Sequence, residues 1–93
     1  MDYIPWIEGL DYLSLGDMHS RDYETLKRHL AHNLRQLRKD AGLSQERLSL
    51  DAQLDRSYVS QIERCVGNPS VLVLATLAST LGCDLVDLFA PPV

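Results

Sequence analysis

Five polar residues between positions 56 and 64 are spaced so that one helix would present them on the same side. At about 100° per residue they share an arc of roughly 140° and are Arg56, Ser57, Ser60, Gln61 and Arg64. Arginine pairs with O6 and N7 of guanine, glutamine pairs with N6 and N7 of adenine, and serine reaches either base or phosphate. This acid-free arc suits the edges of DNA bases. A merely solvated helix face has the same composition, so the arc alone does not decide between the two interpretations.

The segment that precedes this helix favours the interpretation as a DNA contact. Ser44 is a typical helix cap, and Leu48 and Ala52 predict the buried side of a short helix. After a turn, Asp55 is a second cap, for a helix that runs to about Arg64. A short helix, a turn and a second helix form the arrangement that lays the second helix in the major groove while the first crosses the backbone. Free N–H groups at the start of the first helix also suit phosphate.

Further helices are predicted on both sides of this pair. Before it, apolar residues recur every three or four positions and are Tyr23, Leu26, Leu30, Leu34, Leu37 and Ala41. Gly42 ends that helix, Ser70 caps a fourth helix that ends at Gly82, and Asp84 caps a short fifth helix over Leu85–Phe89. The inward side of the fourth helix consists of Leu74, Leu77, Ala78 and Leu81. Because no stretch alternates as a strand would, we expect an all-α fold of five helices.

Composition and charge agree with a small DNA-binding domain. The chain has 93 residues, of which 45% are apolar and 24% charged, as expected for one globular domain. The net charge of −4 argues at first against nucleic acid, but all nine Lys and Arg lie within residues 21–64, among seven acids. The charged residues within positions 1–20 are all acids, with no Lys or Arg among them. No apolar run would span a bilayer and no signal peptide is recognisable, so we expect a cytoplasmic protein.

Several short motifs resemble, in order and spacing, the Xre and Cro/C1-type (lambda-repressor-like) helix-turn-helix regulators. This family includes phage repressors and restriction-modification controller proteins. The motifs are Gly-Leu-Ser-Gln at 42–45, Tyr-Val-Ser-Gln-Ile-Glu-Arg at 58–64, Asn-Pro-Ser at 68–70, Leu-Gly at 81–82 and Asp-Leu-Phe at 87–89. The likeness covers about residues 26–89. It implies a five-helix lambda-repressor-like DNA-binding domain, which we place at residues 21–90, after an acidic and apolar N-terminal extension at 1–20.

The resemblance also implies roles for individual residues. It places Gln45 at a phosphate, Arg56, Ser57 and Gln61 at bases, and Arg64 and Asn68 at the DNA backbone. The candidate DNA-binding set is Ser44, Gln45, Arg56, Ser57, Tyr58, Ser60, Gln61, Arg64 and Asn68. The resemblance further suggests an ion pair between Arg38 and Glu63.

The chain departs from the family at a few positions. The family often has glycine where Cys65 stands, because a helix end there favours a positive φ, so we expect slight backbone strain at Cys65. Leu50 and Leu72 replace residues that are usually polar, which predicts an apolar surface outside the core. Val66 and Gly67 replace basic residues, which predicts fewer phosphate contacts.

These observations predict a sequence-specific transcriptional regulator, a repressor or controller, that binds double-stranded DNA at a palindromic operator. One recognition helix makes few contacts, so we expect a homodimer that binds two half-sites. The resemblance places the dimer interface at Leu85, Val86, Leu88 and Phe89. The alternative is a protein-interaction module, such as an antitoxin or adaptor, whose N-terminal extension binds a protein. Replacing Arg56 and Gln61 by Ala would separate these, because only the regulator would lose its main activity.

Enzymatic activity, a metal site and a cofactor are not expected. The chain carries no nucleophile elbow, phosphate loop or pair of catalytic carboxylates. His29 and His32 have the i, i+3 spacing of metal ligands, but no acid or Cys completes the set, so we interpret them as solvated residues. A redox-sensitive Cys65 beside Arg64 is a minor alternative.

The role of the extension at residues 1–20 is left open. Its many apolar side chains, among them Trp6, Ile7 and Leu10, are unusual for an inert tail. They either pack on their own domain, or cover Leu50 and Leu72 or the same surface of a second subunit.

Overall fold

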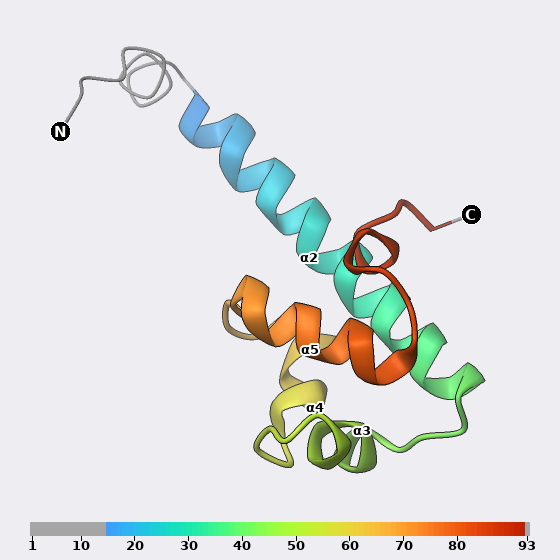
Figure 1. Ribbon diagram of the computed structural model, residues 1–93. Coiled ribbons are helices and arrows are strands. Elements are labelled where there is room, and N and C mark those ends of the chain that lie inside the picture. The colour runs from blue at the N-terminus through green and yellow to red at the C-terminus, as the bar shows by residue number, and fades with distance from the viewer. Residues whose placement is uncertain (1–14, 93) are drawn as a thin grey trace, which may run out of the picture.

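The computed structural model describes residues 15–92, with side chains from Asp22 onward, and every regular element in this range is a helix (Figure 1). The elements are α2 (Leu15–Asp40), α3 (Gln45–Asp51), α4 (Tyr58–Glu63), α5 (Val71–Leu81) and the 3-10 helix η1 (Leu85–Leu88). The predicted all-α class is therefore confirmed for the part of the chain that is described. No helix in this part is both long and apolar enough to cross a membrane.

The prediction of five α-helices is wrong for residues 15–92, which form four. The segment expected to be the fifth is a single 3-10 turn, in which Asp87 N–H bonds to the carbonyl of Asp84 and Phe89 N–H to that of Val86, both at 3.0 Å. These are i to i+3 bonds, which suit short helical segments. The prolines at positions 91–92 lack N–H groups and cannot extend the helix.

Helix α2 is longer than the apolar periodicity predicts. It begins at Leu15, inside the predicted extension, rather than near Tyr23. An apolar stripe marks only the part of a helix that packs against other elements, whereas the first turns of α2 project beyond them (Figure 1). One of the alternatives for residues 1–20 was that their apolar side chains cover Leu50 and Leu72. These side chains lie outside the described ones, which begin at Asp22.

The core lies where α2, α3, α4, α5 and η1 meet. Its fully buried members are Leu34, Leu48, Ser49, Val59, Leu77 and Leu88. At the N-terminal end of the α2 stripe, Tyr23 and Leu26 are 42% and 44% exposed, although the periodicity placed them on the inward face. Their exposure follows from the projection of α2 beyond its neighbours.

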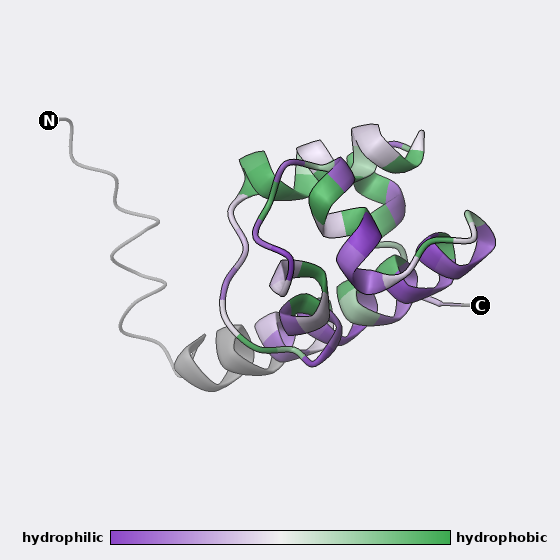
Figure 2. Ribbon diagram, turned by 90° about the horizontal axis from the view of Figure 1, so that it is seen from below, coloured by the Kyte–Doolittle hydropathy of each residue, from purple (hydrophilic) through white to green (hydrophobic). Residues whose placement is uncertain are grey.

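Helix α5 is the most apolar element and is largely green in Figure 2. Its predicted ends are confirmed: the Ser70 hydroxyl accepts from Val73 N–H at 3.1 Å, and Gly82 ends the helix with a φ of +74°. Beyond its buried side, α5 exposes Leu72, at 77%, and Leu50 on α3 is 51% exposed. The prediction that these two leucines lie outside the core is confirmed.

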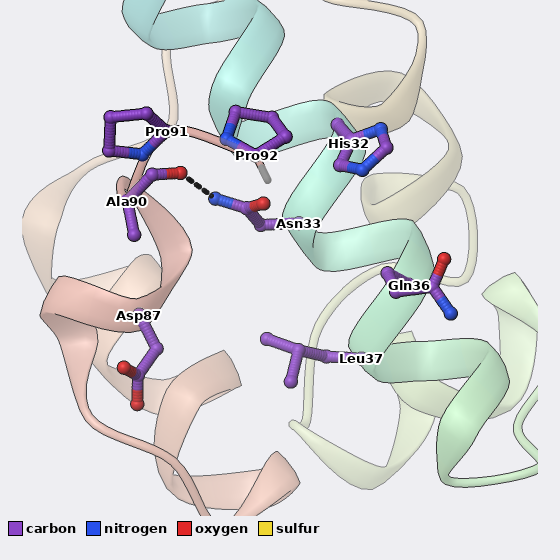
Figure 3. Close-up of a pocket in the computed structure, with 8 residues that line it drawn as sticks. All are labelled: His32, Asn33, Gln36, Leu37, Asp87, Ala90, Pro91 and Pro92. Atoms are coloured by element: carbon purple, nitrogen blue, oxygen red, sulfur yellow. Dashed lines mark hydrogen bonds between the residues drawn. The ribbon is translucent and has the colours of Figure 1, made fainter.

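The C-terminal tail is attached to α2 by Asn33. Its side-chain amide donates to the carbonyl of Leu88 at 3.0 Å and to that of Ala90 at 2.7 Å. Figure 3 shows the second bond at the edge of a hollow of about 420 Å³ between α2 and the tail. Because one side chain binds the carbonyl of the last residue of η1 and a second carbonyl just after it, Asn33 holds η1 against α2.

Candidate nucleic-acid interface

Helices α3 and α4 form the helix-turn-helix that the sequence predicts. Ser44 caps α3, its hydroxyl accepting from Arg47 N–H at 2.9 Å, as expected. Inside the pair, the Ser49 hydroxyl accepts from Val59 N–H at 3.0 Å and donates to the carbonyl of Gln45. Ser49 was not predicted to have a structural role. It joins the first helix directly to the second.

Helix α4 begins later than predicted. Asp55 was expected to cap it directly, but the helix starts at Tyr58 and residues 55–57 form a turn. The Asp55 carboxylate accepts from the backbone N–H of Ser57 at 2.9 Å and from its hydroxyl at 2.6 Å. An aspartate that bonds its neighbour two residues on stabilises a turn before the helix. Asp55 therefore holds the turn in which Arg56 lies, and it orients Ser57.

The hydrogen bonds of this turn keep Asp55 ionised. The hydroxyl of Ser57, then its N–H, lower the pKa of the Asp55 carboxyl. A negative charge therefore stands directly before Arg56 at the start of the candidate face. The sequence-based description of an acid-free arc holds for the arc itself but not for its border.

The polar face of α4 is accessible, and its opposite side is buried as predicted. Val59 and Ile62 belong to the core. In the candidate set Ser44, Arg56, Gln61, Arg64 and Asn68 are exposed, and Gln45, Ser57, Tyr58 and Ser60 are half-buried. Gln61 Nε2 donates to the Ser57 hydroxyl at 3.2 Å and Arg64 Nε to the carbonyl of Ser60 at 3.3 Å. These bonds hold the exposed side chains along the helix. That they contact DNA stays a prediction.

A polar hollow lies between the start of α3 and the start of α4. It measures about 440 Å³ and is lined by Gln45, Glu46, Arg56, Ser57 and Ser60. Four of these five residues belong to the predicted DNA-binding set, so α3 and α4 bring together residues that are separated in the sequence. Glu46 does not belong to that set, and its carboxylate brings a negative charge to the hollow that opposes the positive charge of Arg56.

Three side chains bind the carboxylate of Glu63, which is fully buried. Arg38 binds both of its oxygens, with Nε to Oε2 at 2.7 Å and Nη2 to Oε1 at 3.0 Å. Arg35 Nε and Gln45 Nε2 also donate to Oε1, at 3.1 and 3.0 Å. The expected Arg38–Glu63 pair is confirmed, and the other two partners were not predicted. Since Gln45 is the candidate phosphate contact, this network ties it to α2 and α4.

The network keeps Glu63 charged in spite of burial. Desolvation raises the pKa of the Glu63 carboxyl, but the hydrogen bonds from Arg38, Gln45 and Arg35 together outweigh it and lower that pKa. The bond to Glu63 likewise raises the pKa of Arg38. The Glu63 carboxylate is thus buried among three side-chain partners, in agreement with the structural role expected for it.

The end of α4 shows the backbone geometry expected at Cys65. Its φ is +60°, in the left-handed region that favours glycine. Gln53, in the turn between α3 and α4, has a φ of +61° and was not recognised from the sequence. Both strained residues lie at a helix end of the helix-turn-helix.

Residues proposed for other sites are placed as follows. Val86 is 69% exposed and Leu85 and Phe89 are half-buried, whereas Leu88 is fully buried and cannot offer its side chain to a second chain. His32 is exposed and His29 half-buried, and the described residues hold no cluster of three or more potential metal ligands.

The fold and the exposed second helix define the class of helix-turn-helix DNA-binding proteins. The chain matches the helix-turn-helix family HTH_3 over residues 34–88. It belongs to this family, and so to the DNA-binding transcription regulators of the Xre and Cro/C1 type, as the resemblance implied.

Named relatives agree with this membership. The chain is 38% identical over 71 residues to a hypothetical transcription factor of Neisseria meningitidis, covering 76% of this chain and 67% of that protein. It is 36% identical to the control protein C.MunI of Mycoplasma, covering 70% and 89%. Among solved structures, the restriction-modification controller C.AhdI of Aeromonas hydrophila aligns with a TM-score of 0.64 and 40% identity, over 68% and 91% of the two chains.

Proposed function

We propose that this chain is a sequence-specific transcriptional regulator that reads its operator with the polar face of α4. The observation that carries the proposal is the exposure of Arg56, in the turn that leads into α4, and of Gln61, on α4 itself. Both residue types make bidentate contacts to base edges in the major groove. Gln45, at the start of α3, lines the polar hollow between α3 and α4 and adds an amide donor that suits a phosphate.

The experiment is selection of bound sequences from random duplexes, compared between the natural chain and Arg56→Ala with Gln61→Ala. We expect the natural chain to enrich one motif and the double variant to lose that enrichment, because each base contact contributes about 1–3 kcal/mol to discrimination. The matched control is Arg28→Ala with Gln36→Ala, which removes the same residue types from exposed positions on α2. Unchanged enrichment in the double variant, or no enrichment at all, would contradict the proposal.

We further propose that the operator is palindromic and that two copies of the chain bind it. A single α4 offers few base contacts, and a two-fold dimer doubles them on half-sites one helical turn apart. The controllers C.AhdI and C.MunI among the relatives favour a controller or repressor role. The dimer surface lies around η1, with Val86 exposed between the half-buried Leu85 and Phe89.

Val86→Asp tests this surface, because Val86 is exposed and its replacement leaves the core intact. We expect sedimentation equilibrium to give a weaker dimer for Val86→Asp, with an unchanged midpoint of urea unfolding for the monomer. Leu72→Asp, on the exposed side of α5, is the control. If Val86→Asp dimerises like the natural chain, or if the natural chain is a monomer at all concentrations used with DNA, the dimer proposal fails.

A further inference from the structure

An apolar groove lies beside the projecting half of α2, away from the hollow between α3 and α4. It measures about 260 Å³ and is lined mainly by Tyr23, Leu26, Leu30, Pro69, Val71 and Phe89. Within the described residues nothing covers it, since Tyr23 is 42%, Leu26 44% and Val71 70% exposed. Contiguous apolar surface on a soluble domain usually indicates a binding partner.

The groove is bordered by one positive charge. Lys27 lines it, and its ammonium lies 5.2 Å from the centre of the Tyr23 ring. The long apolar stem of Lys27 can lie along the groove while the charge stays at its edge. An occupant that is apolar and carries acids would therefore match both the floor and the edge.

We propose that the groove is occupied by residues 3–13 of the same chain, folded back along α2. This segment holds seven large apolar residues, which are Tyr3, Ile4, Trp6, Ile7, Leu10, Tyr12 and Leu13. Its charged residues are Glu8 and Asp11, with Asp2 just before it, and it has no Lys or Arg. The apolar side chains of the segment thus match the apolar lining of the groove, and its acids match the positive charge of Lys27.

The length and attachment point of the segment allow this docking. The segment leads directly into α2, which begins at Leu15, and at 1.5 Å per residue Leu26 lies about 16 Å further along that helix. Eleven residues span about 16 Å as a helix and about 36 Å when extended. The segment therefore reaches Tyr23 and Leu26 in either conformation after one reversal of direction.

The same chain is a better occupant than a second copy. A segment joined directly to α2 is present at the groove at a high effective concentration, in the millimolar range for a short connection. Docking within one chain therefore does not depend on protein concentration, whereas exchange between two chains does. This difference gives the experiment a way to separate the two.

Trp6 provides the probe, because it is the single tryptophan of the chain. We expect the full-length protein to show blue-shifted Trp6 emission that acrylamide quenches poorly and that does not change on dilution. Val71→Glu and Leu26→Glu place a carboxylate in the groove at exposed positions. In both variants we expect emission to shift to the red and quenching to increase severalfold, with an unchanged helical circular dichroism spectrum.

Leu72→Glu is the matched control. Leu72 neighbours Val71 on α5 and is 77% exposed, but it does not line the groove. Its replacement should leave Trp6 emission unchanged. If it shifts Trp6 as much as Val71→Glu does, the segment covers the Leu72 surface and the proposal is wrong. Water-like emission in the natural chain, insensitivity to both groove variants, or emission that changes on dilution would also overturn it. Lys27→Glu reverses the charge at the edge of the groove and leaves its apolar lining residues unchanged. It should increase the quenching of Trp6 by acrylamide.

Discussion

The hydroxyl of Ser49 on α3 accepts a hydrogen bond from the backbone N–H of Val59 on α4, at an O···N distance of 3.0 Å. Both residues are fully buried. Since the N–H groups in the first turn of a helix have no partner within the helix, Ser49 supplies one of those that α4 lacks. The relative position of the two helices is thus set by a polar contact inside the core, as well as by apolar packing.

Ser49→Ala tests this contact. We expect the free energy of unfolding to fall by about 1–3 kcal/mol, because the buried Val59 N–H loses its acceptor. Urea unfolding followed by circular dichroism measures the change. Ser79→Ala is the control, since Ser79 is exposed on α5 and Ala favours the helix. A loss for Ser49→Ala no larger than that for Ser79→Ala would show that water or another group replaces the hydroxyl.

Local signals in the sequence predict most of this fold. Ser44 and Ser70 cap helices and Gly82 ends one, because each acts on backbone groups within a few residues. The Cys65 φ follows from the same local geometry. Such features depend on neighbours in the chain, so their residue types and spacing suffice to predict them.

Contacts between distant residues could not be predicted in this way. Asn33 binds carbonyls more than fifty residues away in the sequence. Nothing in the residues next to Asn33 distinguishes its amide from the other polar side chains of α2. Arg35 and Gln45 meet Glu63 only because three helices converge. The start of α2 was missed for another reason: the turns before Tyr23 project from the body, so no apolar stripe marks them. The exposed face of α4 was predicted correctly as an accessible surface, and its contact with DNA stays a prediction.

The buried carboxylate of Glu63 predicts a dependence of stability on pH. Because its pKa is lower in the folded protein than in the unfolded chain, where it is about 4.3, protonation favours unfolding. The stabilisation is complete above that unfolded pKa and is lost as the pH falls through the lower, folded value. Urea unfolding from pH 7 to acid pH should therefore show a steep loss of stability in the acid range.

Glu63→Gln separates this contribution from those of other acids. At neutral pH we expect a loss of about 3 kcal/mol, because the charge of Arg38 stays buried without its counter-charge. In acid the variant should lose less stability than the natural chain. Asp55→Asn is the control for removal of an exposed carboxyl, because the pKa of Asp55 is also lowered but its side chain is not buried among arginines. Parallel pH curves for Glu63→Gln and the natural chain would contradict the assignment.

The positive φ of Cys65 predicts that glycine is better at this position. Cys65→Gly should raise the free energy of unfolding by about 0.5–1 kcal/mol, since the left-handed conformation costs a residue with a Cβ more than it costs glycine. Gly82→Ala is the reciprocal test. Gly82 has a φ of +74° and an added Cβ would meet no atom within 4 Å, so its loss of about 1 kcal/mol would be conformational. A destabilised Cys65→Gly would mean that the Cys65 side chain contributes more than its backbone costs.

The positions of Gln61 and Arg64 on α4 predict two different effects on DNA binding. Gln61 is exposed on α4 and its amide suits a base edge, so Gln61→Ala should reduce affinity for the selected motif by about 1–3 kcal/mol and relax the preference at one base pair. Arg64 lies at the end of α4, where it suits the DNA backbone, so Arg64→Ala should weaken binding to all sequences alike. Titrations at several salt concentrations should then give a slope of log affinity against log salt that is smaller by about one for Arg64→Ala and unchanged for Gln61→Ala. Arg47→Ala, which removes an exposed ion pair with Asp51 on α3, is the control for loss of a positive charge outside this face. If Arg64→Ala keeps the natural slope but changes the selected motif, Arg64 reads a base, and the recognition surface extends to the last turn of α4.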